Sequence, residues 1–197
     1  MELYPDAAVV EMDTAYNDNP NGPLIQTFKF LKYDLLFCIY RMVKTNGSMR
    51  NGILYPEEIL ETEIFSREVM VLLTDRGDEF TFSDETEFRD DGTRRTRIFY
   101  CDSMSSWQKV SIENVRILLR DICSKEVDLS RLVQNSQTKA NRCPSHIHLY
   151  PKKKLNGRSS FQLLEFLSPD MAQILYSAGL IAISPDEVTL KPYLLKK

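Results

Sequence analysis

The chain has 197 residues, of which 43% are hydrophobic and 27% charged, and its formal net charge is −3. These values are typical of a soluble globular protein, and they argue against non-specific nucleic-acid binding, which usually requires a basic excess. The length accommodates one large domain or two small interlocked ones. No apolar run reaches the roughly 18 residues of a membrane-spanning helix, and the start has no signal-peptide pattern, so we expect a cytoplasmic or nuclear protein.

The first half of the chain favours strands. Residues 1–23 are rich in Pro, Asn and Gly, and we expect an extended arm there with one strand at 8–12. Aromatic and β-branched residues dominate 24–43, which predicts one or two strands that end at an Asn-Gly turn. A short strand is expected near 50–56. Alternating apolar residues on both sides of an Asp-Arg-Gly-Asp turn then predict a β-hairpin over 68–84.

The second half mixes strands with two helices. Residues 96–103 alternate like a strand, and 146–151 form a second short strand candidate. Apolar residues recur at helical spacing over 111–124, with Ser111 as the expected N-cap. A second helix is predicted over 168–180, because Ser168 precedes a proline and a glycine lies near its end. Many short strands with two helices indicate an α+β fold, mainly β, in which helices pack on small barrels.

The cysteines and histidines have a structural explanation. No two cysteines form a Cys-x-x-Cys pair, and we expect buried free thiols at Cys38, Cys101, Cys123 and Cys143. His146 and His148 follow Cys143 closely, but a zinc site needs four ligands and no fourth is evident. We therefore predict solvent-facing strand histidines, no metal and no cofactor.

The stretch VMVLLTDRGDEFTF, residues 69–82, resembles the third strand, turn and fourth strand of Tudor domains, with Asp75 and Gly77 kept. HIHLYPKKK and the helix that ends in Ala-Gly-Leu are similar to later elements of extended Tudor domains. The resemblance implies an SH3-like Tudor barrel inserted in a staphylococcal-nuclease-like OB barrel with two packed helices. Residues 1–29 would be an arm of the OB-like lobe, 30–92 the Tudor barrel, and 93–197 the rest of that lobe and the tail.

Extended Tudor domains bind arginine-containing peptides, usually methylated, in a cage of aromatic rings. At the matching positions this sequence has non-aromatic residues, so the resemblance implies no strong binding of dimethylarginine. Acidic residues beside the turn favour an unmethylated guanidinium, which offers paired N–H donors. The expected peptide-binding residues at the barrel mouth are Val43, Met49, Leu73, Arg76, Asp78, Glu79 and Phe80.

The resemblance also implies a biological setting. Members of the family scaffold germline granules (nuage) in the piRNA pathway of transposon silencing, where they dock on the Arg-rich tails of Piwi-family Argonautes. We therefore expect a non-catalytic, peptide-binding scaffold in cytoplasmic, perinuclear ribonucleoprotein granules. Its expected partner is such a tail, recognised without a requirement for arginine methylation.

Features of the sequence bear on three other functions. A nuclease needs metal-binding carboxylates, and Asp121, Glu126 and Asp128 are close in sequence but match no catalytic motif, so no enzyme activity is expected. Basic clusters at 94–97 and 152–154, with aromatic residues nearby, leave single-stranded RNA binding as an alternative. Self-association as a granule scaffold is the third.

Overall fold

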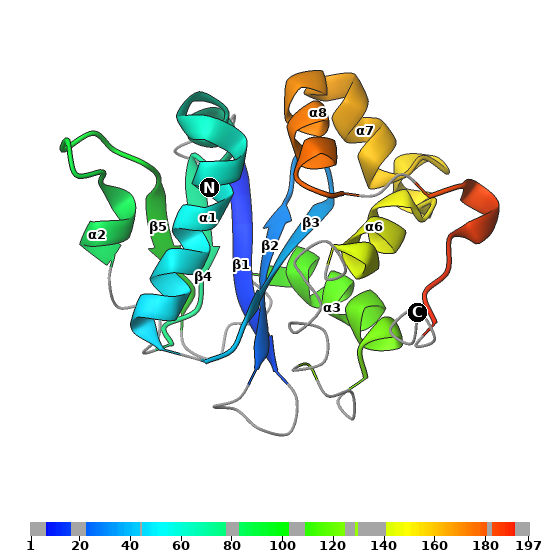
Figure 1. The fold of residues 1–197 in the computed structure, drawn as a ribbon, viewed down its shortest axis with the longest axis horizontal. Helices are drawn as coiled ribbons and strands as arrows, with labels where there is room; N and C mark the ends of the chain where they lie inside the picture. The colour runs from blue at the N-terminus through cyan, green and yellow to red at the C-terminus, as the bar shows by residue number, and fades with distance from the viewer. Residues whose placement is uncertain are drawn as a thin grey trace.

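The computed structural model describes residues 7–16, 23–43, 45–77, 83–102, 109–124, 129, 141–180 and 183–191. Its centre is a five-stranded sheet in the order β3-β2-β1-β4-β5 (Figure 1). The neighbours β1, β2 and β3 are antiparallel, whereas β1, β4 and β5 run parallel. The strands are β1 (Val9–Tyr16), β2 (Leu24–Phe30), β3 (Leu35–Arg41), β4 (Val71–Thr74) and β5 (Arg97–Tyr100).

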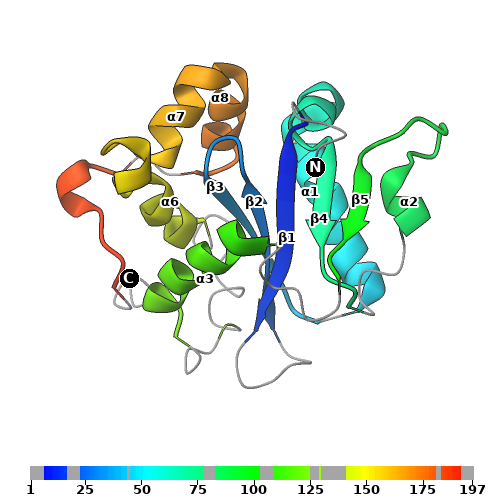
Figure 2. The same ribbon diagram turned by 180° about the vertical axis from the view of Figure 1, so that it is seen from behind.

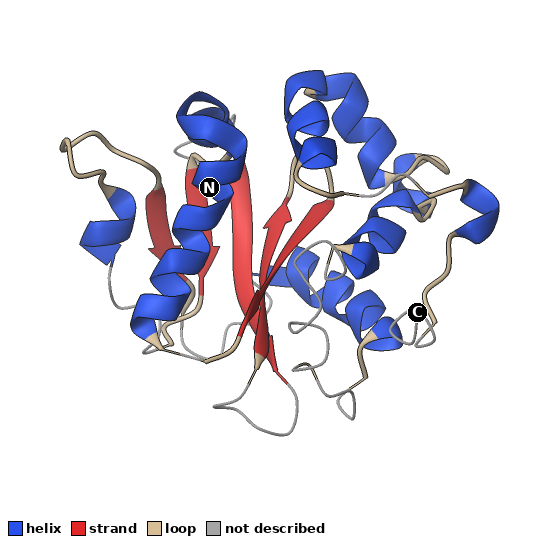
Figure 3. Cartoon of the chain, in the orientation of Figure 1, coloured by secondary structure: helices blue, strands red, loops and turns tan. Residues whose placement is uncertain are grey.

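Helices cover both faces of this sheet, as Figures 2 and 3 show from opposite sides. Among the described residues, no helix is long and apolar enough to cross a bilayer. The helices are α1 (Asn46–Glu68), α2 (Ser83–Glu87), α3 (Val110–Ile122), α6 (Arg142–Leu149), α7 (Ser160–Leu167) and α8 (Pro169–Ser177), with 3-10 turns η3 (Lys153–Leu155) and η4 (Pro185–Glu187).

Strand β1 lies between the two layers of helices, and its side chains alternate between them. Val10 and Met12 belong to the apolar core that α1, α7 and α8 share with the sheet. Ala15 belongs to the second core, which α3 and α6 cover. Glu11 and Asp13 point to this second face as well, because both bond to residues of α3. The central strand therefore carries two carboxylates toward α3.

The α+β class is confirmed, but the arrangement of the described residues is not a Tudor barrel within an OB-like lobe. The strands of the predicted 30–92 barrel, β3 and β4, belong to the same sheet as the strands of the predicted 1–29 arm and of 93–197. The strand predicted near 50–56 is wrong, because these residues lie inside α1. Met49, Ile53 and Leu60 of α1 are buried at helical spacing. Gly52 lets α1 approach the sheet closely, because a Cβ at this position would lie 1.7 Å from Gln26 Oε1.

The remaining predicted elements have mixed outcomes. The strands at 8–12, 24–43 and 96–103 are confirmed as β1, β2 with β3, and β5, and the two predicted helices as α3 and α8. Lys109, not Ser111, is the N-cap of α3. The predicted strand at 146–151 is wrong, since most of it lies in α6. Only the first strand of the 68–84 hairpin is confirmed, as β4; 78–82 lie outside the described residues, and α2 begins at Ser83.

Helix α1 contains a kink at Glu61, where φ is 62° and ψ is 156°. Only glycine adopts this backbone region readily, and other residues there cost about 1–3 kcal/mol. We therefore expect Glu61→Gly to raise the free energy of unfolding by about 1 kcal/mol, after the entropy that glycine loses on folding. Urea unfolding followed by circular dichroism measures this. Glu61→Ala keeps the Cβ and is the control: an equal gain in Ala and Gly variants would show that the carboxylate, not backbone strain, is responsible.

Candidate functional site

Three carboxylates from three elements meet on the α3 face of the sheet, and we call Asp13, Asp75 and Glu113 the acidic cluster. Asp13 lies in β1, Asp75 directly follows β4, and Glu113 lies in the first turn of α3. Lys109 Nζ is 3.7 Å from Asp13 Oδ1 and 3.5 Å from Asp75 Oδ2. Arg116 Nη1 is 2.8 Å from Asp13 Oδ2 and 3.2 Å from Glu113 Oε1. Two basic side chains thus link all three carboxylates.

The strand order explains why these acids converge. Strands β1 and β4 are parallel neighbours, paired from Val9 with Val71 to Glu11 with Leu73. Two residues further along each chain, in the same register, lie Asp13 and Asp75. Asp75 follows the carboxyl end of β4, where functional groups often lie in sheets of parallel strands, whereas Asp13 lies inside β1. The Asp13 side chain is 7% exposed and the Asp75 side chain 52%, so the cluster extends from the interior to the surface.

The carboxylate of Glu11, a β1 residue outside the acidic cluster, fixes α3 against β1. Its Oε2 accepts a hydrogen bond of 2.6 Å from the backbone N–H of Ile112, the third residue of α3. Lys109, the N-cap, provides no side-chain cap of its own. A carboxylate at this position satisfies an otherwise unpaired helix N–H and interacts favourably with the helix dipole. Glu11 therefore positions Lys109 and Glu113, which lie on either side of the bond.

Burial dominates the electrostatics of the two carboxylates on β1. It raises the pKa of Asp13, and the attraction of Lys109 and Arg116 offsets this only in part, while Asp75 adds repulsion. Burial likewise raises the pKa of Glu11, against the opposing effect of its bond from Ile112. The positive charges of Lys109 and Arg116 thus do not fully compensate the desolvation of the ionised Asp13 carboxylate.

Removal of the Glu11 carboxylate should release the start of α3. We expect Glu11→Ala to lower the free energy of unfolding by about 2 kcal/mol, because the Ile112 N–H loses its acceptor in a buried place. Glu11→Gln is the matched control, since its amide oxygen still accepts the bond and the loss should be clearly smaller. Thermal unfolding of the wild type and the two variants measures both losses of stability. Equal losses of unfolding free energy in the two variants would contradict a capping role for Glu11.

The described members of the predicted peptide-binding set differ in exposure. Val43 is exposed after β3, whereas Met49 is completely buried in α1, so Met49 cannot line an open binding surface and its prediction is wrong. Leu73 is half-buried in β4, and Arg76 is exposed next to Asp75. Asp78, Glu79 and Phe80 lie outside the described residues. The residues of this set that lie near the acidic cluster are thus Leu73 and Arg76, at and after the end of β4.

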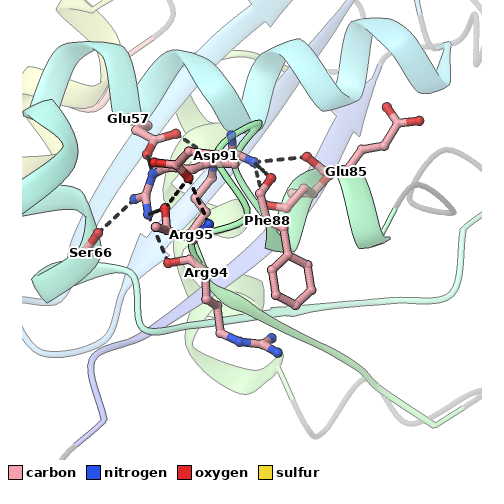
Figure 4. A network of polar contacts seen from close by, with 10 residues as sticks. Glu57, Ser66, Glu85, Phe88, Asp91, Arg94 and Arg95 are labelled. Atoms are coloured by element: carbon pink, nitrogen blue, oxygen red, sulfur yellow. Dashed lines mark hydrogen bonds and ion pairs between the residues drawn. The ribbon is translucent and has the colours of Figure 1, made fainter.

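The basic cluster 94–97 is largely paired within the protein, as Figure 4 shows for part of it. Arg95 Nε is 2.5 Å from Glu57 Oε2 in α1, and its Nη1 donates to three backbone carbonyls, those of Glu85, Thr86 and Phe88. Arg94 pairs with Glu87 at 2.7 Å and lies over the Phe88 ring. These contacts attach the segment before β5 to α1 and α2. RNA binding by this cluster remains a prediction.

The cysteines are confirmed as free and buried: Cys38, Cys101, Cys123 and Cys143. The histidine prediction is wrong, because His146 and His148 are buried in α6 rather than exposed on a strand. Burial holds the pKa of His148 well below its usual value. Within the described ranges, no three Cys, His, Asp or Glu side chains are close enough to hold a metal ion as they stand. In the acidic cluster, Lys109 and Arg116 lie between the carboxylates.

Sequence reasoning missed the acidic cluster. Asp75 was assigned to a turn, and neither Asp13 nor Glu113 was singled out. The signal available was an acid inside the apolar strand VVEMDTAY and a second acid directly after the apolar strand VLLT. Of the carboxylates considered for a nuclease, Asp121 is exposed in α3, and Glu126 and Asp128 lie outside the described residues.

Comparison with known proteins identifies the fold. No family model and no curated protein matches the chain. A chain of the simian T-cell lymphotropic virus intasome in complex with PP2A regulatory subunit B56 gamma is similar with a TM-score of 0.58 and 12% identity; the match covers 79% of this chain and 53% of that one. The HTLV-2 integrase catalytic core domain in complex with magnesium has a TM-score of 0.55 and 11% identity, and the match covers 79% of this chain and 95% of that one. The BIV integrase catalytic core domain has a TM-score of 0.54 and 12% identity, and the match covers 79% of this chain and 92% of that one.

At these identities the similarity shows a shared fold and nothing of the activity. The described residues therefore have the fold of integrase catalytic cores. The first of these matches spans about half of the other chain, whereas the two catalytic core domains are covered almost completely.

Proposed function

We propose that the chain catalyses divalent-metal-dependent phosphoryl transfer on nucleic-acid phosphodiesters, in the manner of an integrase. The observation that carries the proposal is the convergence of Asp13, Asp75 and Glu113 from β1, β4 and α3 around shared cations. The fold supports it, because similar structures are integrase catalytic cores and one of them is in complex with magnesium. This replaces the expectation of a non-catalytic domain as the preferred function.

The donor set fits a hard divalent cation. Carboxylate oxygens are the ligands that Mg²⁺ and Mn²⁺ prefer, and the cluster offers three carboxylates without any sulfur or imidazole. Lys109 and Arg116 already pair with these acids, so a metal ion would have to displace at least one of these side chains. The residues that would hold the metal are Asp13, Asp75 and Glu113.

Each residue of the cluster has a distinct task in this proposal. Asp13 is a rigid anchor, because it is buried in the central strand. Asp75 and Glu113 are half-exposed and face the side from which a polynucleotide can approach. Glu11 orients Glu113 through its bond to Ile112. A divalent ion at such a site lowers the pKa of an attacking water and stabilises charge on phosphoryl oxygens.

Cleavage of labelled DNA tests the proposal. The whole chain is incubated with double-stranded and single-stranded oligonucleotides in Mg²⁺, Mn²⁺, Ca²⁺ or EDTA. We expect nicked or joined products in Mg²⁺ or Mn²⁺ and none in EDTA. Absence of products with all substrates and both metals, from a protein that circular dichroism shows to be folded, would overturn it.

A second candidate function is a non-catalytic binding module. The observation that favours it is that Lys109 and Arg116 already pair with the acidic cluster, as counter-ions that replace a metal would. The proposal of an Arg-rich Argonaute tail as partner, in perinuclear granules, belongs to this candidate. Titration of such a peptide, unmethylated and symmetrically dimethylated, tests it. Binding of single-stranded RNA instead, or self-association by light scattering without either ligand, would replace the peptide.

A further inference from the structure

We propose that the connection between α6 and α7 is a contact surface for the phosphate backbone of a single-stranded nucleic acid. We call residues 152–158 the basic loop, because they contain Lys152, Lys153, Lys154 and Arg158 and no acidic residue. The choice of a nucleic acid rests on the proposed function, in which the substrate is a polynucleotide. Binding at the basic loop requires neither a metal ion nor cleavage, so it can be measured separately.

The basic loop is a closed turn that presents three cations to solvent. The backbone N–H of Lys152 donates to the carbonyl oxygen of Arg158 over 3.0 Å, and the N–H of Gly157 donates to that of Lys152 over 3.1 Å. These two bonds join the ends of the loop. Lys153, Lys154 and Arg158 are exposed on it. Three positive charges therefore lie together on one short surface loop.

Buried contacts fix the base of the basic loop to the sheet. Lys152 Nζ lies 2.7 Å from Oδ2 of Asp34, in the turn between β2 and β3, and 2.6 Å from Oγ of Ser160, the first residue of α7. Lys154 Nζ lies 2.8 Å from Oδ1 of the same carboxylate, yet its side chain is 58% exposed. Because the loop is already ordered, binding to it costs little conformational entropy.

Positive charge at the base of the loop is only partly neutralised. Lys29, Lys152 and Lys154 all pair with the Asp34 carboxylate, although Lys29 is also attracted by Glu11, its partner across β1 and β2. In the described part of the chain, Lys152 and Lys154 have no other carboxylate within 4 Å. Burial lowers the pKa of Lys152, and repulsion from Lys154 adds to this against the attraction of Asp34. An anion next to Lys154 would offset that repulsion.

The partner that fits this surface is a flexible polyanion with exposed bases. Phosphates along a single strand can each meet one of the three exposed cations of the loop. Tyr150 lies two residues before the loop, at the C-terminal end of α6, and is 44% exposed. Its ring offers a face on which a base can stack. An acidic peptide supplies carboxylates for the cations but no base for this ring.

Fluorescence anisotropy tests the inference, with the whole chain titrated into labelled oligothymidylate or oligouridylate in EDTA over a series of salt concentrations. We expect Lys153→Gln and Arg158→Gln each to weaken binding about threefold, and the double variant about tenfold. The slope of log affinity against log salt concentration should fall by about 1.4 in the double variant, for two lost phosphate contacts. Lys191→Gln, at an exposed lysine outside the loop, is the control and should bind like the wild type.

A variant of the aromatic side chain tests the choice of partner. Tyr150→Leu keeps apolar bulk, and we expect it to weaken binding of both single strands about tenfold through the lost stacking. Circular dichroism checks that all variants are folded. If polyglutamate displaces the labelled strand as effectively as the unlabelled strand does, the partner is any polyanion and the assignment to nucleic acid is overturned.

The outcomes separate this inference from the proposed function. If the wild type binds neither strand, or the double variant binds like Lys191→Gln, the basic loop is not the contact surface and the inference is overturned. Cleavage in Mg²⁺ or Mn²⁺ with such loop-independent binding would leave the proposed function standing. Loop-dependent binding in EDTA without cleavage in either metal would confirm the contact surface and overturn the catalytic function.

Discussion

If the proposed function holds, Asp75→Asn is expected to reduce metal-dependent DNA cleavage by about a thousandfold, because the change removes one charged ligand of the proposed metal and its share of the charge stabilisation. The aspartate is half-exposed at the end of β4, so the folded structure should survive the substitution. Cleavage rates in Mn²⁺ under single-turnover conditions measure the loss. Asp90→Asn, at another exposed aspartate, is the matched control and should cleave at the wild-type rate.

Asp13→Asn and Glu113→Gln should cause losses of the same order. Asp13→Asn also leaves Lys109 and Arg116 with less compensation, so its stability must be measured beside its activity. Asp75→Asn removes only the half-exposed partner of Lys109 and leaves the Arg116–Asp13 pair in place, so it is the deciding variant. Wild-type cleavage by folded Asp75→Asn would show that the acidic cluster does not hold the catalytic metal.

The second large effect concerns Asp34, which lies in the turn between β2 and β3 and collects three ammonium groups. Lys29 is fully buried and pairs with its carboxylate, Lys152 Nζ lies 2.7 Å from Oδ2, and Lys154 Nζ lies 2.8 Å from Oδ1. Lys152 and Lys154 come from the connection between α6 and α7, so the cluster fastens this connection to the sheet. Asp34→Asn is expected to cost about 3 kcal/mol of unfolding free energy, because buried charges lose their partner.

Lys154→Met provides the control for this prediction. Its side chain is 58% exposed, and an exposed ion pair contributes only about 0–1 kcal/mol. Urea unfolding at pH 7 measures both variants. A loss in Asp34→Asn no larger than that in Lys154→Met would contradict a buried ionic clamp.

The pH dependence gives an independent check on Asp34. Burial alone would raise its pKa, but the surrounding ammonium groups outweigh this and lower the pKa from 3.8 to about 2. Between these values the unfolded chain binds more protons than the folded one, so stability falls as the pH drops. The difference in unfolding free energy between wild type and Asp34→Asn should therefore narrow by about 2 kcal/mol from pH 4 to pH 2.

Lys29 acts in the opposite direction. Burial and the nearby Lys152 lower its pKa to about 7, although Asp34 attracts its charge. In the folded protein Lys29 therefore loses its proton at lower pH than in the unfolded chain. The charged Lys29 therefore lowers the free energy of unfolding at and below pH 7. This destabilisation disappears as the pH rises from about 7 to the usual lysine pKa of 10.5.

Local patterns predicted several elements correctly and the architecture incorrectly. The apolar spacing of 111–124 and the Ser-Pro start at 168 identified α3 and α8, because amphipathic periodicity and caps are local signals. Residues 50–56 hold a short apolar run, Ile53 to Tyr55, between a glycine and a proline, and this pattern favoured a short strand. Burial of Met49, Ile53 and Leu60 against the sheet decides for a helix, and that contact is not local.

The candidate site depends on strand order, which no local pattern contains. Asp13 and Asp75 become neighbours only because β1 and β4 pair in parallel across the connection formed by β2, β3 and α1. Glu113 joins them because Glu11 binds the start of α3. The motif resemblance placed Asp75 in a turn of a barrel, and the same residue directly follows β4, the neighbour of the central strand β1.

Crystals of the protein soaked in Mn²⁺ would test the metal site most directly, through the anomalous scattering of the ion. We predict an anomalous peak in contact with Asp13 and Asp75, with the Lys109 ammonium displaced from between them. Density with Lys109 still between the two carboxylates and no peak at the acidic cluster, at a concentration of Mn²⁺ that fills sites elsewhere, would contradict a metal-dependent function.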